Sequence, residues 1–420
     1  MKKLALPILF LLPLLALSPY VFSQNAGCDG SRYKNDVFGT VKKTTVQYAT
    51  ATNQLGTPVN LLMDVYEPQD DNLAARPVVV LAHGGSFIFG DKSDMRDFCT
   101  LLAKKGYVAA TIQYRLYPFF ILGIPDSVKI FDQAVRAVGD MKAAVRYFRE
   151  DAATQNQFRA DADNIFIGGY SAGAVTALHA GFLDSADVLP AFIQSAINAN
   201  GGLNGNSGSA SNKTYSSAIK AVVNMSGGIY RSEWVDNKDI ALASIHGTAD
   251  ATVPYAYGLA AGIAYLEGTG LIHPVAESND LLHDLQTVPG GGHTDIYSAQ
   301  QAAFVPHVDT FWVKATTILE YLTCQLVLSN TAVEREAERW SLFPNPATDG
   351  TVRIELPSDV QLISVTIADW AGKVVFQSNN ISNQGSLHLN NLPAGVYAVK
   401  VHDTNNRSRS FAAQQLVLTH

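Results

Sequence analysis

Residues 164–173 read NIFIGGYSAG, and they carry the strongest structural signal in the chain. The run from Asn164 to Gly168 is typical of a buried strand, and the residues after Ser171 are typical of a helix. So tight a turn from strand to helix strains the backbone of its serine, and glycines at 169 and 173 avoid collisions with neighbouring elements. We therefore predict that the Ser171 hydroxyl is presented at the carboxyl end of a strand.

Apolar runs and helical segments alternate on both sides of this turn. Residues 77–82 are an unbroken apolar run, as in a strand buried on both faces of a parallel sheet. Residues 44–66 alternate polar and apolar side chains, which predicts a hairpin. We expect further strands at 107–113, 164–168, 220–225, 240–246 and 285–288, and helices at 93–105, 128–150, after Ser171 and at 308–328. This alternation predicts an α/β fold with a doubly wound, mostly parallel sheet.

The pattern changes at Trp340. From there on, short alternating segments such as Gly395–Val401 are separated by turn residues, which predicts a small all-β sandwich over residues 340–420. The charged stretch before it predicts a linker at 329–339, which leaves residues 24–328 for the α/β domain.

Residues 198–212 interrupt the alternation of strands and helices. They are rich in Gly, Asn and Ser, which predicts a loop on the rim above the sheet. We expect this insert to contribute to a small lid.

The composition excludes several classes of protein. The chain has 420 residues, of which 47% are hydrophobic and 16% are charged, so most of it should pack into cores. The formal net charge of -7 provides no basic surface for phosphate backbones, so we expect no nucleic-acid partner.

The first residues predict export. Lys2 and Lys3 precede an apolar stretch from Leu4 to Leu17 and a small residue at Ser23, which predicts a signal peptide over residues 1–23. Ala26-Gly27-Cys28 leaves a lipoprotein cleavage box as an alternative. No later segment has the roughly 18 uninterrupted apolar residues that a bilayer requires, so we expect no transmembrane segment.

Three cysteines, Cys28, Cys99 and Cys324, would enter an oxidising compartment. Cys324 lies in an apolar helical segment, where a buried, unpaired thiol is the common role. The sequence therefore favours a disulfide between Cys28 and Cys99.

A nucleophilic serine needs a base that takes its proton and an acid that orients the base. Asp250 directly follows the predicted strand 240–245, and His293 directly follows the strand 285–288. In folds with this strand-turn-helix serine, the acid and then the base follow later strands. We therefore predict a triad of Ser171, Asp250 and His293. The alternative residues are Asp236 and Asp239 for the acid, and His273, His283 and His307 for the base. His246 is expected to be structural.

A glycine-rich loop, His83-Gly84-Gly85-Ser86-Phe87, follows the predicted strand at 77–82. Such a loop can turn its backbone amides inward, and together with the amide of Ala172 it would form an oxyanion hole for acyl transfer. His83 is expected to brace the loop.

These motifs together resemble the carboxylesterase and lipase branch of the α/β-hydrolases that carries an HGG motif. The matching segments within residues 40–326 are His83–Phe87, Tyr114–Leu116, Gly169–Gly173, His246-Gly247 with Asp250, and Gly292-His293. The resemblance implies an ester hydrolase that forms an acyl-enzyme, with oxyanion amides from Gly85, Ser86 and Ala172. Many relatives have a third glycine at the position of Ser86 and an acidic residue at that of Tyr170.

The tail resembles the type A C-terminal sorting domain of type IX secretion substrates. The resemblance rests on Leu342–Ala347, Ala371–Val375 and Leu392–Tyr397. It implies recognition by the type IX secretion machinery, export through the periplasm, and release from the cell or attachment to its surface.

Two other functions remain open from the sequence. One is a serine peptidase of the prolyl-oligopeptidase type, although those usually have a tyrosine where Ala172 stands and a large propeller domain. The other is a non-catalytic surface binding protein, although such proteins commonly lose a triad residue. No cluster of Cys and His and no phosphate-binding loop is present in the sequence, so we expect neither metal nor cofactor. The expected substrate is a small-molecule or polymer ester.

Overall fold

The computed structural model describes residues 27–324 and, within 340–419, all residues except 357–359, 361, 370–372, 383–384, 404–410 and 412–413. The predicted signal peptide and linker lie outside the described residues. The described residues fall into two compact units, one within Gly27–Gln325 and one within Leu326–His420. No helix in the described part of the chain is long and apolar enough to cross a membrane.

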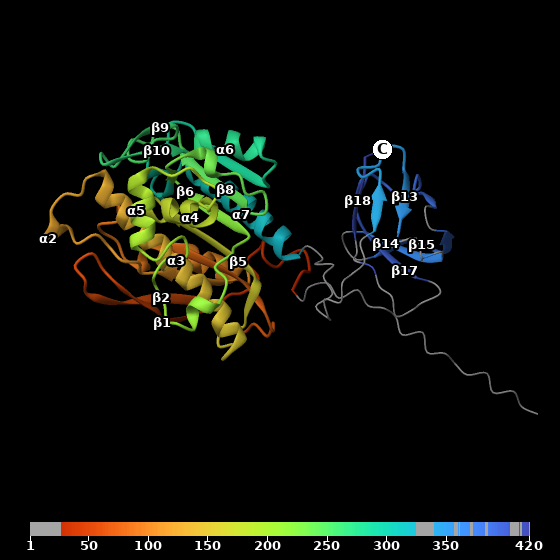
Figure 1. Cartoon of the computed structure of the whole chain (residues 1–420), viewed down its shortest axis with the longest axis horizontal. Helices are drawn as coiled ribbons and strands as arrows, with labels where there is room; N and C mark the ends of the chain where they lie inside the picture. The colour runs from red at the N-terminus through yellow and green to blue at the C-terminus, as the bar shows by residue number, and fades with distance from the viewer. Residues whose placement is uncertain are drawn as a thin grey trace, which may run out of the picture. The chain divides into compact units, whose positions relative to one another are not determined.

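The first unit is built on a sheet of eight strands (Figure 1). In spatial order they are β1 (Val41–Thr52), β2 (Pro58–Pro68), β4 (Val108–Ile112), β3 (Arg76–Ala82), β5 (Ala160–Tyr170), β6 (Ala221–Met225), β8 (Ala241–Gly247) and β11 (His283–Val288). β1, β2 and β4 pair antiparallel, and every pair from β4 to β11 is parallel. The predicted α/β fold with a mostly parallel sheet is confirmed.

Helices cover both faces of this sheet, because side chains alternate between the two faces along each strand. On β3, Val78 and Val80 belong to one apolar core, whereas Val79 and Leu81 belong to the other. The first core includes α3 (Ser127–Ala153), α4 (Ala172–Phe182), α5 (Ala191–Ala199) and α6 (Thr269–Ser278). The second includes α1 (Arg96–Lys104) and α7 (Val305–Cys324). The sheet is therefore doubly wound.

Several short elements were not predicted from the sequence. They include α2 (Phe119–Leu122), α5, α6 and a separate antiparallel sheet of β7 (Gly228–Ile229), β10 (Ala264–Gly268) and β9 (Tyr257–Ala260). The part of the chain that the structure describes also has 3-10 turns at η1 (Lys92–Met95), η2 (Asn212–Thr214), η3 (Ser232–Trp234) and η4 (Asp295–Tyr297).

The insert at 198–212 lies against α3. The Lys142 ammonium donates a hydrogen bond to the Leu203 carbonyl oxygen (2.8 Å), and the Arg146 guanidinium donates to the carbonyl oxygens of Asn204 and Ser207 (3.0 Å each). These bonds satisfy loop carbonyls beside a helix, so the insert docks there, and its residues are not among those that line the pocket at Ser171. A contribution of the insert to a lid stays a prediction.

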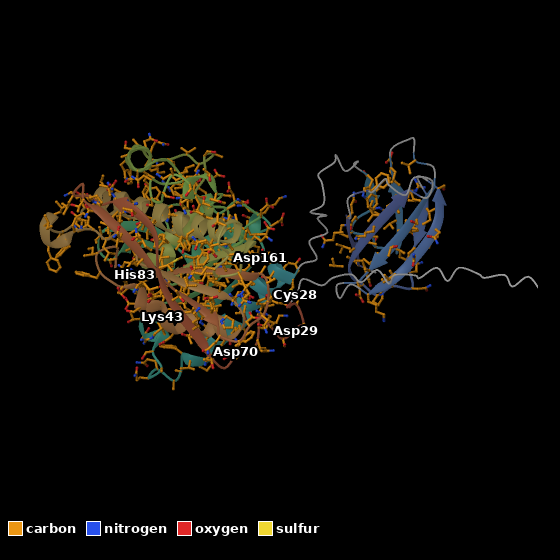
Figure 2. The ribbon with its side chains drawn as sticks, turned by 90° about the horizontal axis from the view of Figure 1, so that it is seen from below. Cys28, Asp29, Lys43, Asp70, His83 and Asp161 are labelled. Atoms are coloured by element: carbon orange, nitrogen blue, oxygen red, sulfur yellow. A yellow bond between two sulfur atoms is a disulfide. The ribbon has the colours of Figure 1, made fainter. Side chains whose placement is uncertain are left out.

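The cysteine prediction is wrong. Cys28, labelled in Figure 2, forms a disulfide with Cys324, and Cys99 is a free, buried thiol. Cys99 lies on the face of α1 that packs into the second core, where it is fully buried. The N-terminal segment around Cys28 and Lys34 instead runs beside the end of α7, where Lys34 forms an ion pair with Glu320 (3.0 Å).

The second unit consists of two antiparallel sheets that share one apolar core. The strands of one sheet are β12 (Ser341–Phe343), β13 (Thr351–Glu355) and β16 (Ser386–His388), and those of the other are β15 (Val374–Ser382), β14 (Leu362–Ala368), β17 (Gly395–Asp403) and β18 (Gln414–Leu418). Alternate residues such as Val352 and Ile354 on β13 and Val365 and Ile367 on β14 face this core. The tail therefore has the all-β architecture predicted from its alternating pattern.

Candidate active site

The candidate site lies at the carboxyl ends of four parallel strands. β3 leads into the glycine-rich loop, β5 into Ser171, β8 into the turn with Asp250, and β11 into the loop with His293. Parallel strands end at the same edge of a sheet, so residues up to 210 positions apart in the sequence can meet there. The structure brings His293 within hydrogen-bonding distance of both Ser171 and Asp250.

Ser171 lies in a strained turn between β5 and α4. Its φ of 54° and ψ of -121° are in a region that residues other than glycine rarely adopt. The amide of Ser171 donates to the Met225 carbonyl oxygen (2.9 Å), which anchors the turn to β6. A Cβ at Gly173 would collide with the Ala82 carbonyl group, so only glycine lets α4 start this close to the end of β3.

The His293 ring links the serine to the carboxylate. Its Nε2 lies 2.8 Å from the Ser171 Oγ, and its Nδ1 lies 2.6 Å from the Asp250 Oδ2. The carboxylate accepts only, so Nδ1 carries the proton and Nε2 can accept the serine proton. The Asp250 Oδ1 accepts from the backbone amides of Thr252 (2.8 Å) and Val253 (2.9 Å), which orients the carboxylate.

A second histidine contacts the same carboxylate. His246 is fully buried, with its Nε2 3.2 Å from the Asp250 Oδ2 and 2.9 Å from the Val253 carbonyl oxygen. Its Nδ1 lies 2.6 Å from the Thr269 hydroxyl, which can donate to it and so leave the proton on Nε2. Burial by itself would raise the pKa of Asp250, but hydrogen bonds from His246 and His293 hold that pKa well below its ordinary value. The sequence predicted a structural role for His246 but not this contact with Asp250.

The glycine-rich loop turns sharply after β3. Gly85, Ser86 and Phe87 have φ values of 111°, 54° and 64°, and the Gly85 carbonyl oxygen accepts from the amides of Ile88 and Phe89 (2.9 Å each). Within the described residues, the amide N–H groups of Gly85 and Ser86 have no acceptor. Ala172 is the first residue of α4, where the N–H has no acceptor inside the helix. The loop therefore offers unpaired donors close to Ser171.

His83 holds this loop in place through a hydrogen bond and a ring contact. Its Nδ1 donates to the Gly84 carbonyl oxygen (2.7 Å), and its ring stacks on that of Tyr114 at a centroid distance of 4.4 Å. Burial lowers the pKa of His83, so the ring is neutral. These contacts fit the structural role expected for His83.

A pocket that is open to solvent lies beside Ser171. Its lining is almost entirely apolar and consists of Ser86, Phe87, Ile130, Phe131, Ala134, Ser171, Ala172, Val175, Thr252, Val253, Ala260, Ala261, Ile263, Ala264 and Leu266. Ser86 and Ala172 are among these residues, whereas Gly85 is not. The walls come from α3, α4 and the β9–β10 hairpin. The sequence predicted the two helices but not the hairpin.

The alternative acids and bases have other surroundings. Asp236 and Asp239 are exposed residues before β8, at the opposite end of that strand from Asp250. His273 and His283 bond to each other through their Nδ1 atoms (2.9 Å), and His307 bonds to Gln286 (2.9 Å).

The sequence also did not predict the contact between Tyr170 and His293. The tyrosine hydroxyl donates to the His293 carbonyl oxygen (3.2 Å), and the two ring centroids lie 5.3 Å apart. Its place next to Ser171, where many relatives carry an acidic residue, was the available signal. Tyr170 therefore ties the loop of His293 to the turn of Ser171.

Two family models match the chain. Residues 63–231 match the family BD-FAE, and residues 341–412 match the secretion system C-terminal sorting domain. The sorting domain indicates export, with secretion or attachment to the cell surface.

Similar proteins cover parts of the chain. Para-nitrobenzyl esterase of Bacillus subtilis (strain 168) is 31% identical over 117 residues, which are 28% of this chain and 23% of that protein. Gut esterase 1 of Caenorhabditis briggsae is 36% identical over 107 residues, which are 24% of this chain and 17% of that protein. The chain thus spans about a quarter or less of the length of these relatives. A solved carbohydrate esterase from gut microbiota, in a truncated form, is 19% identical with a TM-score of 0.46, over 69% of this chain and 98% of that one.

The family matches agree with the motifs around His83 and Ser171 and with those of the tail. Residues 63–231 therefore lie in a domain of the HGG-type esterase and lipase branch of the α/β-hydrolases, and residues 341–412 in a type IX secretion sorting domain.

Proposed function

We propose that this chain is a secreted carboxylic-ester hydrolase that works through an acyl-enzyme intermediate. The observation that carries the proposal is the chain of hydrogen bonds from the Ser171 Oγ through the His293 ring to Asp250, beside an apolar pocket. The roles are nucleophile for Ser171, general base for His293 and orienting acid for Asp250.

Acylation begins when the His293 Nε2 takes the proton of the Ser171 hydroxyl as the Oγ attacks the ester carbonyl carbon. The carbonyl oxygen becomes an oxyanion, which the amides of Gly85, Ser86 and Ala172 stabilise. The intermediate then expels the alcohol, which takes the proton from His293 and leaves the acyl group on Ser171. Water repeats these steps, releases the carboxylic acid and restores the serine.

Asp250 stabilises the imidazolium that forms in both steps. Its depressed pKa keeps the carboxylate ionised at neutral pH, and its contact with His293 Nδ1 keeps the proton on that nitrogen. The apolar pocket suits the acyl part of the ester, and the tail engages the secretion machinery.

The test uses the purified chain and its Ser171→Ala variant. We expect the wild type to hydrolyse p-nitrophenyl butyrate and to be labelled by a fluorophosphonate probe. Ser171→Ala should lose the labelling and at least roughly 10⁴-fold in turnover. Ser195→Ala, which removes an exposed hydroxyl on α5, is the matched control and should keep both.

Three outcomes would contradict the proposal. Labelling of Ser171→Ala would place the nucleophile elsewhere. Faster cleavage of a peptide p-nitroanilide than of any ester would favour the peptidase alternative. A folded wild-type protein without either activity would favour the binding protein.

A further inference from the structure

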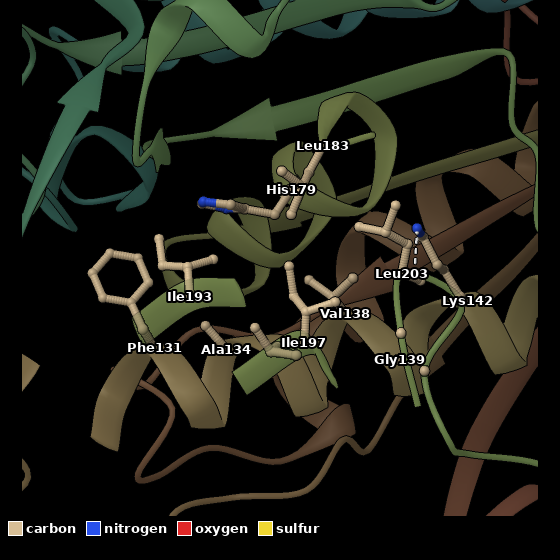
Figure 3. A pocket seen from close by; sticks show the side chains of 13 residues that line it. Phe131, Ala134, Val138, Gly139, Lys142, His179, Leu183, Ile193, Ile197 and Leu203 are labelled. Carbon is tan, nitrogen blue, oxygen red and sulfur yellow. Dashed lines mark hydrogen bonds between the residues drawn. The ribbon is translucent and has the colours of Figure 1, made fainter. Parts of the chain in front are cut away.

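A second apolar pocket lies directly beside the one at Ser171. Figure 3 shows its lining side chains. They belong to Phe131, Ala134, Val135, Val138, Gly139, Lys142, His179, Leu183, Ile193, Ile197, Gly202, Leu203 and Gly205. Phe131 and Ala134 also line the pocket at Ser171, so the two pockets share a wall.

The two pockets lie one after the other along the groove between α3 and α4. On α4, Val175 lines the first pocket, and His179, four residues later on the same face, lines the second. On α3, the wall continues from Phe131 through Val138 to Lys142, again at the spacing of one helix face. The second pocket therefore begins about one helical turn, roughly 5.4 Å, farther from Ser171 along α4.

Phe131 stands where the first pocket ends. Its ring packs edge-on against Phe192 and Tyr230, at centroid distances of 5.5 and 5.1 Å, and only 6% of the residue is exposed. Ala134, the other shared residue, has a side chain of a single methyl group. The Phe131 ring is therefore the bulky part of the shared wall.

The side chains that line the second pocket favour an aliphatic ligand over a polar one. The His179 Nδ1 donates to the Val175 carbonyl oxygen (2.7 Å), and its Nε2 accepts from the Tyr230 amide (3.2 Å). Burial lowers the pKa of His179 to about 4, so the ring is neutral, with both nitrogens bonded. Lys142 lies at the far end and donates to the Leu203 carbonyl oxygen (Figure 3). A sugar or other polar group would lose hydrogen bonds to water among these apolar walls.

We propose that Phe131 determines the acyl specificity of the esterase by closing the acyl pocket at short acyl groups, with the second pocket as a latent extension for longer aliphatic chains. The inference rests on the proposed function. A small residue at 131 would join the two pockets along the groove, and each further methylene that moves from water into it should favour binding by roughly fourfold.

The experiment compares kcat/KM for p-nitrophenyl butyrate and octanoate. The wild type should prefer butyrate, and Phe131→Ala should raise the ratio of octanoate to butyrate at least tenfold. Phe131→Leu, which leaves a smaller opening and disturbs the core less, should raise the ratio by a smaller factor. Val138→Phe, added to Phe131→Ala, should fill the second pocket and cancel the gain.

The outcomes separate this inference from the proposed function. A wild type that hydrolyses butyrate through Ser171, with an unchanged ratio in both folded Phe131 variants, would overturn the inference alone. A wild type that already prefers octanoate would also overturn it. Absence of all ester hydrolysis and probe labelling would instead overturn the proposed function.

Discussion

Replacing Asp250 by Asn tests the site most sharply, because the two carboxylate oxygens have separate tasks. Oδ1 accepts from the amides of Thr252 and Val253, whereas Oδ2 faces His293 and His246. An asparagine can keep its oxygen at the Oδ1 position, so the turn should stay folded. Its NH₂ group then takes the place of Oδ2 and donates to the Nδ1 of His293.

That exchange reverses the tautomer of the base. If Nδ1 must accept, the ring proton moves to Nε2, which then points at the Ser171 Oγ and cannot take its proton. In a serine protease this change lowers kcat by about 10⁴, and the 2.6 Å contact here leads us to expect a similar loss, worth about 5 kcal/mol. His293→Ala should lose more, and combined with Ser171→Ala it should cost little beyond either change alone.

The assay is the turnover of p-nitrophenyl butyrate together with the rate of fluorophosphonate labelling. Asp236→Asn and Asp239→Asn are matched controls, because they make the same change at exposed sites near the other end of β8. The circular dichroism of all variants should match the wild type. A folded Asp250→Asn protein with more than a tenth of the wild-type turnover would refute the reasoning, and a large loss in either control would move the acid to that position.

Three further predictions concern stability and the tail. A chain ending at Asn330 should keep its turnover on a soluble ester, because the residues that form the site lie within Gly27–Gln325; insolubility or a large loss of activity would show that the catalytic unit needs the tail. Cys28→Ser should lower the free energy of unfolding by about 3 kcal/mol in urea titrations and abolish the response to reductant, whereas Cys99→Ala should keep that response; loss of the response in both variants would restore the Cys28–Cys99 pairing. Burial lowers the pKa of His179 to about 4, and burial with the neighbouring His283 lowers that of His273 to about 3, so both are neutral in the fold but take up protons below about pH 6.5 when unfolded. The two histidines contribute fully to the free energy of unfolding above that pH. This contribution is lost as the pH falls toward 4 and 3, by about 2 kcal/mol per histidine between pH 6.5 and 5. In urea titrations, His273→Phe should make the free energy of unfolding less dependent on pH, and an equally steep loss in that variant would contradict the prediction.

The sequence predicted most of the sheet because its signals are local. Val78–Leu81 and Ile165–Ile167 are apolar runs that only a doubly covered strand can bury, and the glycines around Ser171 mark a turn that no bulky residue could make. Asp250 and His293 could be selected because each directly follows a strand, and parallel strands end at one edge.

The contacts around these residues were beyond the reach of sequence patterns. His246 and Tyr170 touch Asp250 and His293 through side chains whose direction depends on how β8, β5 and the loop after β11 pack together. The wall of the pocket comes from Phe131 on α3 and from the β9–β10 hairpin, which belong to different parts of the chain.

By itself, the sequence determined most strands of the main sheet, the serine turn and the export-type tail, because periodicity, glycine spacing and short motifs are properties of neighbouring residues. Only the tertiary structure decided which cysteine pairs with Cys28, where the insert at 198–212 docks, and which residues border the acyl pocket. Each of these depends on segments that meet after folding, and the free energy that brings them together comes from burial of apolar surface, which has no direction along the chain.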